Sequence, residues 1–167
     1  MRRFASRDLR SFRGKDSYII MSGNTKENYY TSKEFFDKVL RYRRLEGTAS
    51  EYMGIEITDV GPGWAKGELS YREYHVNPIG SVHGGVIFFL ADSVGGTAAS
   101  SRGSRVTTAN GTISYLNAAM NPEKLIAEAV ELKAGKNLLT YDVYIRTEEG
   151  KLVAKATLEY FSLHMEI

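Results

Sequence analysis

The sequence predicts an α+β fold in which a curved antiparallel sheet wraps around one long apolar helix. The first observation is that residues 86–99 are apolar on nearly every helical face. Such a helix is either buried or membrane-spanning, and this one is too short and too polar for a span, which needs ~20 apolar residues. The second observation is that segments on both sides alternate apolar and polar side chains, as strands do. A buried helix over about residues 82–102, enclosed by a sheet, is the economical packing.

Composition bounds the fold and the chemistry. The chain has 167 residues, 43% hydrophobic and 25% charged, which is ordinary for one globular domain. It has no cysteine, which excludes disulfides, thiolate nucleophiles and cysteine zinc sites. Its histidines, His75, His83 and His164, share no metal-ligand spacing, so we expect no metal site. No transmembrane run and no signal-peptide segment are recognisable, so the expected location is the cytoplasm.

Positive charge is concentrated at the N-terminus. Residues 1–20 hold six basic and two acidic side chains, a net charge of +4, and because the whole chain carries +2, the remainder carries −2. We expect residues 1–30 to be a basic, disordered extension and residues 31–167 to be the domain, which is not predicted to bind nucleic acid. The extension fits an arm for nucleic acid or anionic lipid, a transit peptide, or a tail without specific function, and Met21 is a plausible alternative first residue.

The elements before the apolar helix are a helical pair and a hairpin. Residues 31–34 fit a capping box, and helical spacing of apolar residues predicts a helix over 32–44. A second short helix is expected over 49–53, ending at Gly54. The period then changes to two, which predicts a strand from residue 54 to 60 and a partner strand over 64–71.

Four strands are expected after the apolar helix, over residues 106–116, 125–132, 138–146 and 152–163. Residues 125–132 could be helix or strand by propensity, and the flanking turn signals favour strand. We expect these strands to form a meander. An open antiparallel sheet leaves edge strands, so we also expect a homodimer that extends the sheet, or a dimer of dimers.

The loop before the apolar helix and one carboxylate within it are the candidate functional features. Asn77 precedes a proline and marks a turn, and His83-Gly84-Gly85 leads into the helix. Asp92 lies on the buried helix, where a charge costs several kcal/mol unless it is paired. From the helix alone, Asp92 is either a structural carboxylate bonded to a nearby backbone or hydroxyl group, or a functional one.

Residues 75–92, HVNPIGSVHGGVIFFLAD, resemble the signature of hotdog-fold acyl-CoA thioesterases of the phenylacetic-acid-degradation (PaaI-like) type. The pattern is Asn, a short loop, His-Gly-Gly, an apolar run and then Asp. The order of the expected elements resembles that fold as well, over residues 49–163.

The resemblance implies an active site between two subunits. It implies that Gly84 directs its backbone N–H at the thioester carbonyl, and that Asn77 and His83 help to hold the carbonyl and the loop. Asp92 of the partner subunit is then the base that activates water, or the nucleophile, and Thr108 matches the hydroxyl residue that orients the water. Taken singly, His83 also fits a loop histidine bonded to backbone, and Asn77 also fits simple turn chemistry.

The resemblance also implies contacts with coenzyme A, which is part of the substrate, so no separate cofactor is expected. The residues it indicates are Tyr115, Leu116, Asn117, Lys133, Gly135, Lys136 and Asn137. A glycine turn flanked by lysines suits phosphates, and it equally fits a solvated hairpin turn.

Three functions are compatible with the resemblance: a thioesterase, a non-catalytic acyl-CoA-binding regulator, and a hotdog hydratase. Such regulators carry a helix-turn-helix, whereas only one convincing helix precedes the domain here. Hydratases pair an Asp with a His a few residues downstream, and no His follows Asp92 in the apolar helix. We therefore predict an acyl-CoA hydrolase that acts on an acyl- or aryl-CoA thioester.

Overall fold

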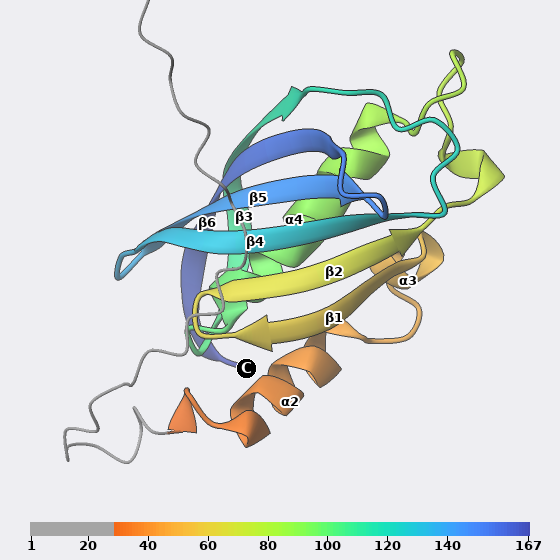
Figure 1. The fold of residues 1–167 in the computed structure, drawn as a ribbon. Coiled ribbons are helices and arrows are strands. Elements are labelled where there is room, and N and C mark those ends of the chain that lie inside the picture. Colours follow the sequence, from red (N-terminus) through yellow and green to blue (C-terminus); the bar gives the residue numbers. More distant parts are fainter. Residues whose placement is uncertain (1–28) are drawn as a thin grey trace, which may run out of the picture.

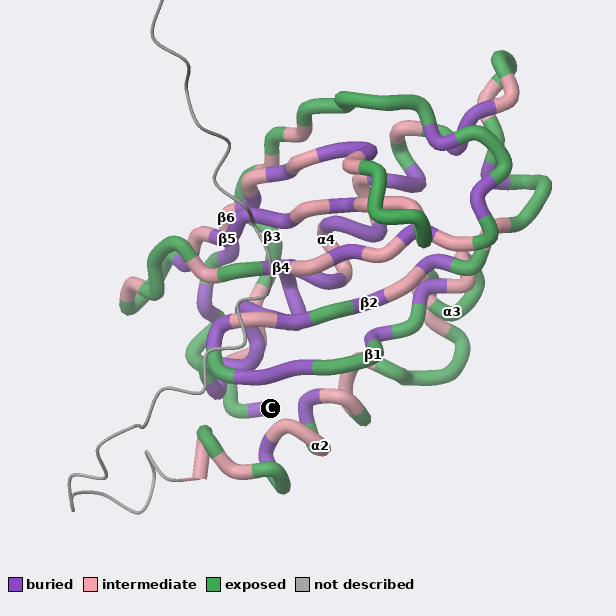
Figure 2. The backbone as a smooth tube through the Cα atoms, viewed as in Figure 1, coloured by how far each residue is buried: buried purple, intermediate pink, exposed green. Residues whose placement is uncertain are grey.

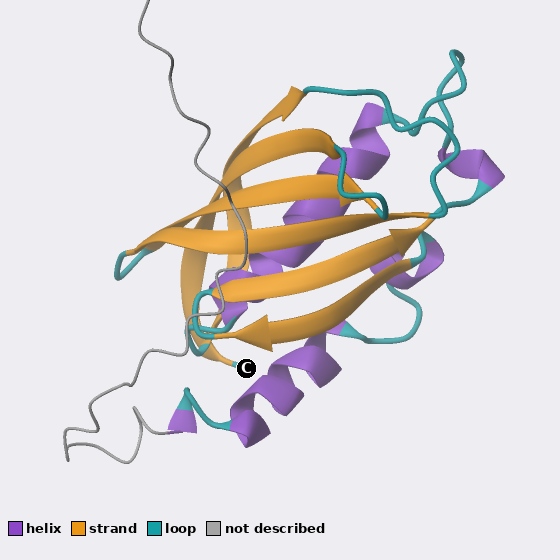
Figure 3. Ribbon diagram, in the orientation of Figure 1, coloured by secondary structure: helices purple, strands orange, loops and turns teal. Residues whose placement is uncertain are grey.

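The computed structural model describes residues 29–167. Figure 1 shows the elements in chain order, which are α2 (Lys33–Arg43), α3 (Ala49–Tyr52), β1 (Ile55–Gly61), β2 (Trp64–Ser70), the 3-10 turn η1 (Glu73–His75), α4 (Gly84–Ser100), β3 (Ser104–Tyr115), β4 (Lys124–Ala134), β5 (Leu138–Thr147) and β6 (Leu152–Glu166). Each predicted helix and strand is present, within a few residues of its predicted bounds. The predicted fold class is confirmed: the strands curve around α4 as one antiparallel sheet (Figure 3).

The order of the strands corrects the predicted meander. The sheet runs β1-β2-β4-β5-β6-β3, so β3 pairs with β6 and only β4, β5 and β6 form a meander. The reason is the path of α4, which follows β2 and crosses the concave face of the sheet before the chain enters β3. The chain therefore emerges at the far edge, and β4 takes the place beside β2.

The central helix is enclosed by small and aliphatic side chains. Helix α4 packs against β2, β3, β4 and β5, and Leu90, Ala91, Val94, Ala98 and Ala99 on it are fully buried. Figure 2 shows that the buried positions concentrate where the sheet faces this helix. Gly67 of β2 allows close approach, because a Cβ built there would lie 2.7 Å from a methyl group of Val94.

The ends of α4 differ slightly from the prediction. The helix begins at Gly84 rather than near residue 82, because His83 is extended and acts as its N-cap. It ends at Ser100, and Gly103 completes the turn with a φ of +95°, a conformation that side-chain-bearing residues rarely adopt.

Helix α2 lies along the β1 edge of the sheet (Figure 1). Its N-cap is Ser32, whose hydroxyl accepts a hydrogen bond from the Phe35 N–H at 3.2 Å. The predicted capping box over residues 31–34 is therefore wrong by one residue. Tyr29 and Tyr30 pack against Phe35, with ring centroids 5.6 and 5.1 Å away. The predicted domain boundary at residue 30 stays a prediction, since residues 1–28 lie outside the described part of the chain.

A hydrogen-bonded network joins the C-terminal end of α4 to the sheet. Arg102 donates two hydrogen bonds to the Glu131 carboxylate, at 2.6 and 2.7 Å, and the Tyr141 hydroxyl donates a third at 2.9 Å. Burial opposes ionisation of Glu131, but the bonds from Arg102 and Tyr141 outweigh it, and the pKa of Glu131 lies below its ordinary value. The network therefore stabilises the ionised carboxylate.

We predict that Glu131→Gln lowers the free energy of unfolding by about 1–3 kcal/mol, because it leaves the Arg102 guanidinium without its anionic partner. The folded-state pKa of Glu131 is depressed, so its stabilisation is complete above the unfolded-state pKa and disappears as the pH falls through the folded-state pKa. Denaturant unfolding at about pH 7 and about pH 3 should show a difference from wild type that shrinks in acid.

The matched control is Glu128→Gln, which removes an ion pair to Lys66 whose two side chains are about half exposed. It should change stability by less than about 1 kcal/mol. A loss at Glu131 no larger than the loss at Glu128 would contradict the role given to the network.

Candidate active site

The start of α4 presents one unused backbone donor. The Gly85 N–H donates to His83 Nδ1 at 2.9 Å, and the N–H groups of Val86 and Ile87 donate to the His83 carbonyl. This leaves the Gly84 N–H without a hydrogen-bond partner among residues 29–167. A free N–H at the positive end of a helix dipole is suited to an oxygen that gains negative charge.

Gly84 is held in place by Tyr115 at the end of β3. The Tyr115 hydroxyl donates to the Gly84 carbonyl at 2.8 Å, and burial raises the pKa of Tyr115, so the hydroxyl stays a donor. A Cβ at residue 84 would lie 3.0 Å from this ring, which explains why the position suits glycine.

The side chain of Asn77 closes its own loop. Its Oδ1 accepts hydrogen bonds from the Ile79 and Ser81 N–H groups, both at 3.1 Å, and its Nδ2 donates to Ser81 Oγ at 2.8 Å. This is the turn chemistry that the sequence allowed for. The loop borders a cavity of about 370 Å³ lined also by Gly84, Tyr115, Leu116 and Asn117. The structure therefore brings four of the predicted substrate-binding and catalytic residues together with Asn77.

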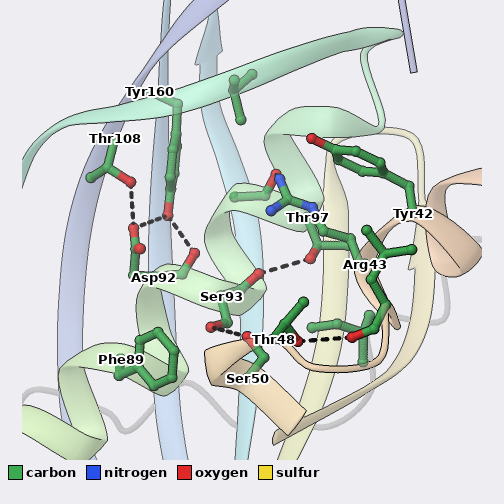
Figure 4. A pocket seen from close by; sticks show the side chains of 14 residues that line it. Tyr42, Arg43, Thr48, Ser50, Phe89, Asp92, Ser93, Thr97, Thr108 and Tyr160 are labelled. Atoms are coloured by element: carbon green, nitrogen blue, oxygen red, sulfur yellow. Dashed lines mark hydrogen bonds between the residues drawn. The ribbon is translucent and has the colours of Figure 1, made fainter. Parts of the chain in front are cut away.

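Asp92, the last residue of the sequence motif, lines a second cavity of about 280 Å³ (Figure 4). It is half-buried on α4. Thr108 Oγ1 donates to its Oδ1 at 2.7 Å, and the Tyr160 hydroxyl lies 3.0 Å from its carbonyl oxygen and 3.3 Å from Oδ1. Thr108 therefore contacts Asp92 directly within one chain, and its expected role of orienting the water stays a prediction.

Strand register explains why two hydroxyl groups meet at this carboxylate. Thr108 of β3 and Tyr160 of β6 are directly paired across the sheet, so their side chains lie on the same face, toward α4. Burial, followed by the charge of Asp92 and the hydrogen bond to it, raises the pKa of Tyr160 well above its ordinary value. Tyr160 therefore remains protonated and is a permanent donor.

Sequence reasoning missed Tyr160 and Arg43, which line the same cavity. Tyr160 had been placed in an alternating strand without a role. The available signal was the pair Gly95-Gly96 within α4, since glycine in a helix often marks a close approach. A Cβ at Gly95 would lie 2.4 Å from the Tyr160 hydroxyl oxygen, and one at Gly96 would lie 3.3 Å from Arg43 Nη2.

The two cavities stay apart within one chain. Gly84 and Asp92 are eight residues apart on α4, which corresponds to about 12 Å of helix. No residue lines both cavities. The predicted oxyanion donor and the predicted base are therefore not brought together by a single chain.

The remaining predicted coenzyme A residues lie on the hairpin between β4 and β5. Asn137 contacts His164 at 3.1 Å and accepts from the Ser162 N–H at 2.8 Å, near the end of β6, whereas Tyr115 pairs with Ala154 near its start. The hairpin residues Lys133, Gly135, Lys136 and Asn137 therefore occupy the opposite end of the sheet from Tyr115, Leu116 and Asn117.

Two kinds of feature are absent from the described residues, a metal-binding cluster and a membrane-spanning helix. Residues 29–167 contain no group of three or more His, Asp or Glu side chains arranged to hold a metal ion. Within the same range, no helix has the length and apolar character needed to cross a membrane.

Comparison with known proteins places this geometry in a family. The model of the Thioesterase superfamily matches residues 79–154. Acyl-coenzyme A thioesterase PaaI of Escherichia coli is 30% identical over 102 residues, covering 61% of this chain and 73% of that protein. Acyl-coenzyme A thioesterase 13 of Homo sapiens is 31% identical over 104 residues, covering 60% of this chain and 74% of that protein.

Solved structures agree. The E. coli PaaI protein aligns with a TM-score of 0.71 at 26% identity, covering 77% of this chain and 94% of that chain. A hypothetical thioesterase protein from Streptococcus pneumoniae, solved with coenzyme A, gives a TM-score of 0.68 at 25% identity, covering 78% and 98%. The architecture is a hotdog fold of the PaaI-like type, as the sequence motif indicated. The chain belongs to the thioesterase superfamily.

The close approach of Gly95 and Tyr160 can be tested by a double-mutant cycle. In wild type, Gly95→Ala should destabilise the fold by about 1–3 kcal/mol, because the added Cβ meets the Tyr160 hydroxyl. In a Tyr160→Phe background the hydroxyl is absent, and the same substitution should cost at least about 1 kcal/mol less. Urea unfolding of the four proteins gives the coupling energy, and equal costs in both backgrounds would show that the contact does not constrain the helix.

Proposed function

We propose that this protein is an acyl-CoA thioesterase that hydrolyses an acyl- or aryl-CoA thioester to the free acid and coenzyme A. The observation that carries the proposal is the Asp92 carboxylate, half-buried at a cavity and held by the hydroxyls of Thr108 and Tyr160. Membership of the thioesterase superfamily supports it, as do two relatives named acyl-coenzyme A thioesterases.

The active site is shared between the two subunits of a homodimer in this proposal. Its support is the separation of the two half-sites in one chain, with the free Gly84 N–H in one cavity and Asp92 in the other. Gly84, Asn77 and His83 of one subunit then face Asp92 and Thr108 of the other. Edge strand β3 leaves backbone groups that a second copy could pair with, whereas α2 lies along the β1 edge.

The proposed reaction assigns one task to each half-site. The thioester carbonyl oxygen accepts the Gly84 N–H, where the helix dipole stabilises the negative charge of the tetrahedral intermediate. Asp92 takes a proton from water as the resulting hydroxide adds to the carbonyl carbon, or its carboxylate attacks that carbon directly. The C–S bond then breaks and the thiolate of coenzyme A takes up a proton. If Asp92 is the nucleophile, this step leaves an acyl anhydride on Asp92, and water must then hydrolyse the anhydride to release the free acid. Thr108 fixes one carboxylate oxygen and leaves the other for this chemistry.

Coenzyme A enters as part of the substrate, and no separate cofactor takes part in this scheme. Tyr115, Leu116 and Asn117 line the cavity that contains Gly84, so they are placed to hold the part of coenzyme A next to the thioester. Lys133 and Lys136 form no ion pair with a described residue, but their β4–β5 hairpin lies at the other end of the same chain, so in this proposal the hairpin of the other subunit meets the phosphates. Cytoplasmic location is part of the same proposal and agrees with the absence of cysteine.

We predict that Asp92→Asn lowers kcat by roughly 10²–10⁴, because the amide can neither take up the proton nor attack. Folding should be nearly unchanged, since the Asn oxygen still accepts from Thr108 and a buried charge is removed. Acyl-CoA hydrolysis and thermal melting, measured on one preparation, test both statements.

Asp142 provides the matched control, since it is a buried carboxylate of β5 that accepts from Thr157 at 2.6 Å and pairs with Lys155 at 2.8 Å. Asp142→Asn should lose about 1–3 kcal/mol of stability, while the folded protein keeps its kcat. The opposite pattern, a destabilised but fully active Asp92→Asn protein, would mean that Asp92 is a structural carboxylate.

A further inference from the structure

A guanidinium group enters the cavity that contains Asp92. Arg43, at the end of α2, reaches across to α4 (Figure 4), where its Nη2 donates to the Gly96 carbonyl at 2.5 Å and to Ser100 Oγ at 2.6 Å. The Nε–H is buried and has no hydrogen-bond partner in the described chain. The contacts to α4 therefore use only one nitrogen of the guanidinium.

Arg43 also has no carboxylate partner within residues 29–167. Arg44 Nη2 lies 3.8 Å from Glu56 Oε1, and Arg102 forms a bidentate ion pair with Glu131. No ion pair among the described residues includes Arg43. Burial lowers the pKa of Arg43, although the group stays charged because an arginine pKa lies far above neutrality. The guanidinium of Arg43 also lies 5.5 Å from the ring centroid of Tyr42, which lines the same cavity.

Arg43 lacks a direct ion-pair partner in the described chain, since the charge of Asp92 acts on it only at longer range. An anionic ligand that reaches the guanidinium adds the direct contact that is missing. A carboxylate is the natural complement, because its two oxygens match the donors of a guanidinium. Contacts with Gly96 and Ser100 alone would explain a structural tether, but they leave the Nη1 donors unused.

The position of Arg43 defines what could reach it. Gly96 and Ser100 follow Asp92 by four and eight residues, or about 6 and 12 Å along the helix axis. An extended acyl chain of five or six carbons covers a comparable length when its thioester carbon lies near Asp92. Hydroxyl groups of Thr48, Ser50, Ser93 and Thr97 line the cavity between, so its wall is not suited to a long aliphatic chain.

We propose that Arg43 is the distal end of the acyl site and that it binds the free carboxylate of a dicarboxylic acyl group. This inference rests on the proposed thioesterase function. The thioester end of such a substrate lies at Asp92, and its carboxylate pairs with the Nη1 donors, which the contacts to α4 leave unused.

The test compares adipyl-CoA with hexanoyl-CoA, which have the same number of carbons and differ in the terminal carboxylate. Wild type should hydrolyse adipyl-CoA with a kcat/KM at least about tenfold higher, as expected for a charge-assisted contact. Arg43→Met keeps a side chain of similar length without the charge. It should abolish this preference through KM for adipyl-CoA, while hexanoyl-CoA turnover changes less than about threefold.

Arg44→Met is the control, because it removes the adjacent arginine, whose contacts are with Glu56 and the Ile57 carbonyl rather than the cavity. It should leave the preference intact. Arg43→Lys keeps the charge and should retain part of the preference for adipyl-CoA. It therefore keeps the test valid if Arg43→Met folds poorly, which thermal melting would reveal.

The outcomes separate this inference from the function on which it rests. If wild type hydrolyses neither substrate nor any other acyl-CoA, the proposed function fails. If wild type hydrolyses hexanoyl-CoA as well as or better than adipyl-CoA, the thioesterase stands and the carboxylate site is wrong. The site is also wrong if Arg43→Met lowers both activities equally, because Arg43 is then only a tether between α2 and α4.

Discussion

A carboxylate on an enclosed helix is the constraint on which the rest of this structure depends. Asp92 lies on α4, which the sheet surrounds, and its charge is tolerated because Thr108 and Tyr160 direct hydroxyl groups at it. Both donors exist at this point only because β3 crosses to the far edge and pairs with β6, with Thr108 opposite Tyr160. The pairing of β3 with β6 therefore brings both donors to Asp92, and the same pairing completes the sheet that curves around α4.

Small residues on α4 let polar groups approach a helix that is otherwise sealed by apolar packing. Gly95 admits the Tyr160 hydroxyl, and Gly96 admits the guanidinium of Arg43. Glycine in a helix costs about 1 kcal/mol relative to alanine, so Gly95 and Gly96 lower the intrinsic stability of α4. As a result, the carboxylate of Asp92 on α4 and the guanidinium of Arg43 from α2 are both held beside the same cavity. The proposed chemistry and the proposed acyl selectivity both follow from that arrangement.

Much of this could be predicted from the sequence, for identifiable physical reasons. Periodicity and turn signals together located the α-helices and the strands, and the motif from Asn77 to Asp92 indicated the family and the candidate residues. Strand order could not be read in this way, because alternation reports which face a residue occupies and not which strand lies beside it. Tyr160 and Arg43 were missed for the same reason, since their contacts depend on segments far apart in the chain. The capping position of α2 was displaced by one residue because adjacent Thr31 and Ser32 are both competent caps.

Subunit complementation tests the shared site most directly. Gly84→Pro removes the free N–H at the first position of α4, where the proline backbone is tolerated because His83 already has the extended conformation that proline requires of its predecessor. Gly84→Ala is its control, because it places the same Cβ near the Tyr115 ring but keeps the N–H. Gly84→Pro and Asp92→Asn should each be nearly inactive as homodimers. Co-expressed with different tags, they should form heterodimers in which one site carries both substitutions and the other carries neither. Purified heterodimers should then show about half of wild-type acyl-CoA hydrolysis per dimer. Heterodimers as inactive as either parent would contradict an active site built from two chains.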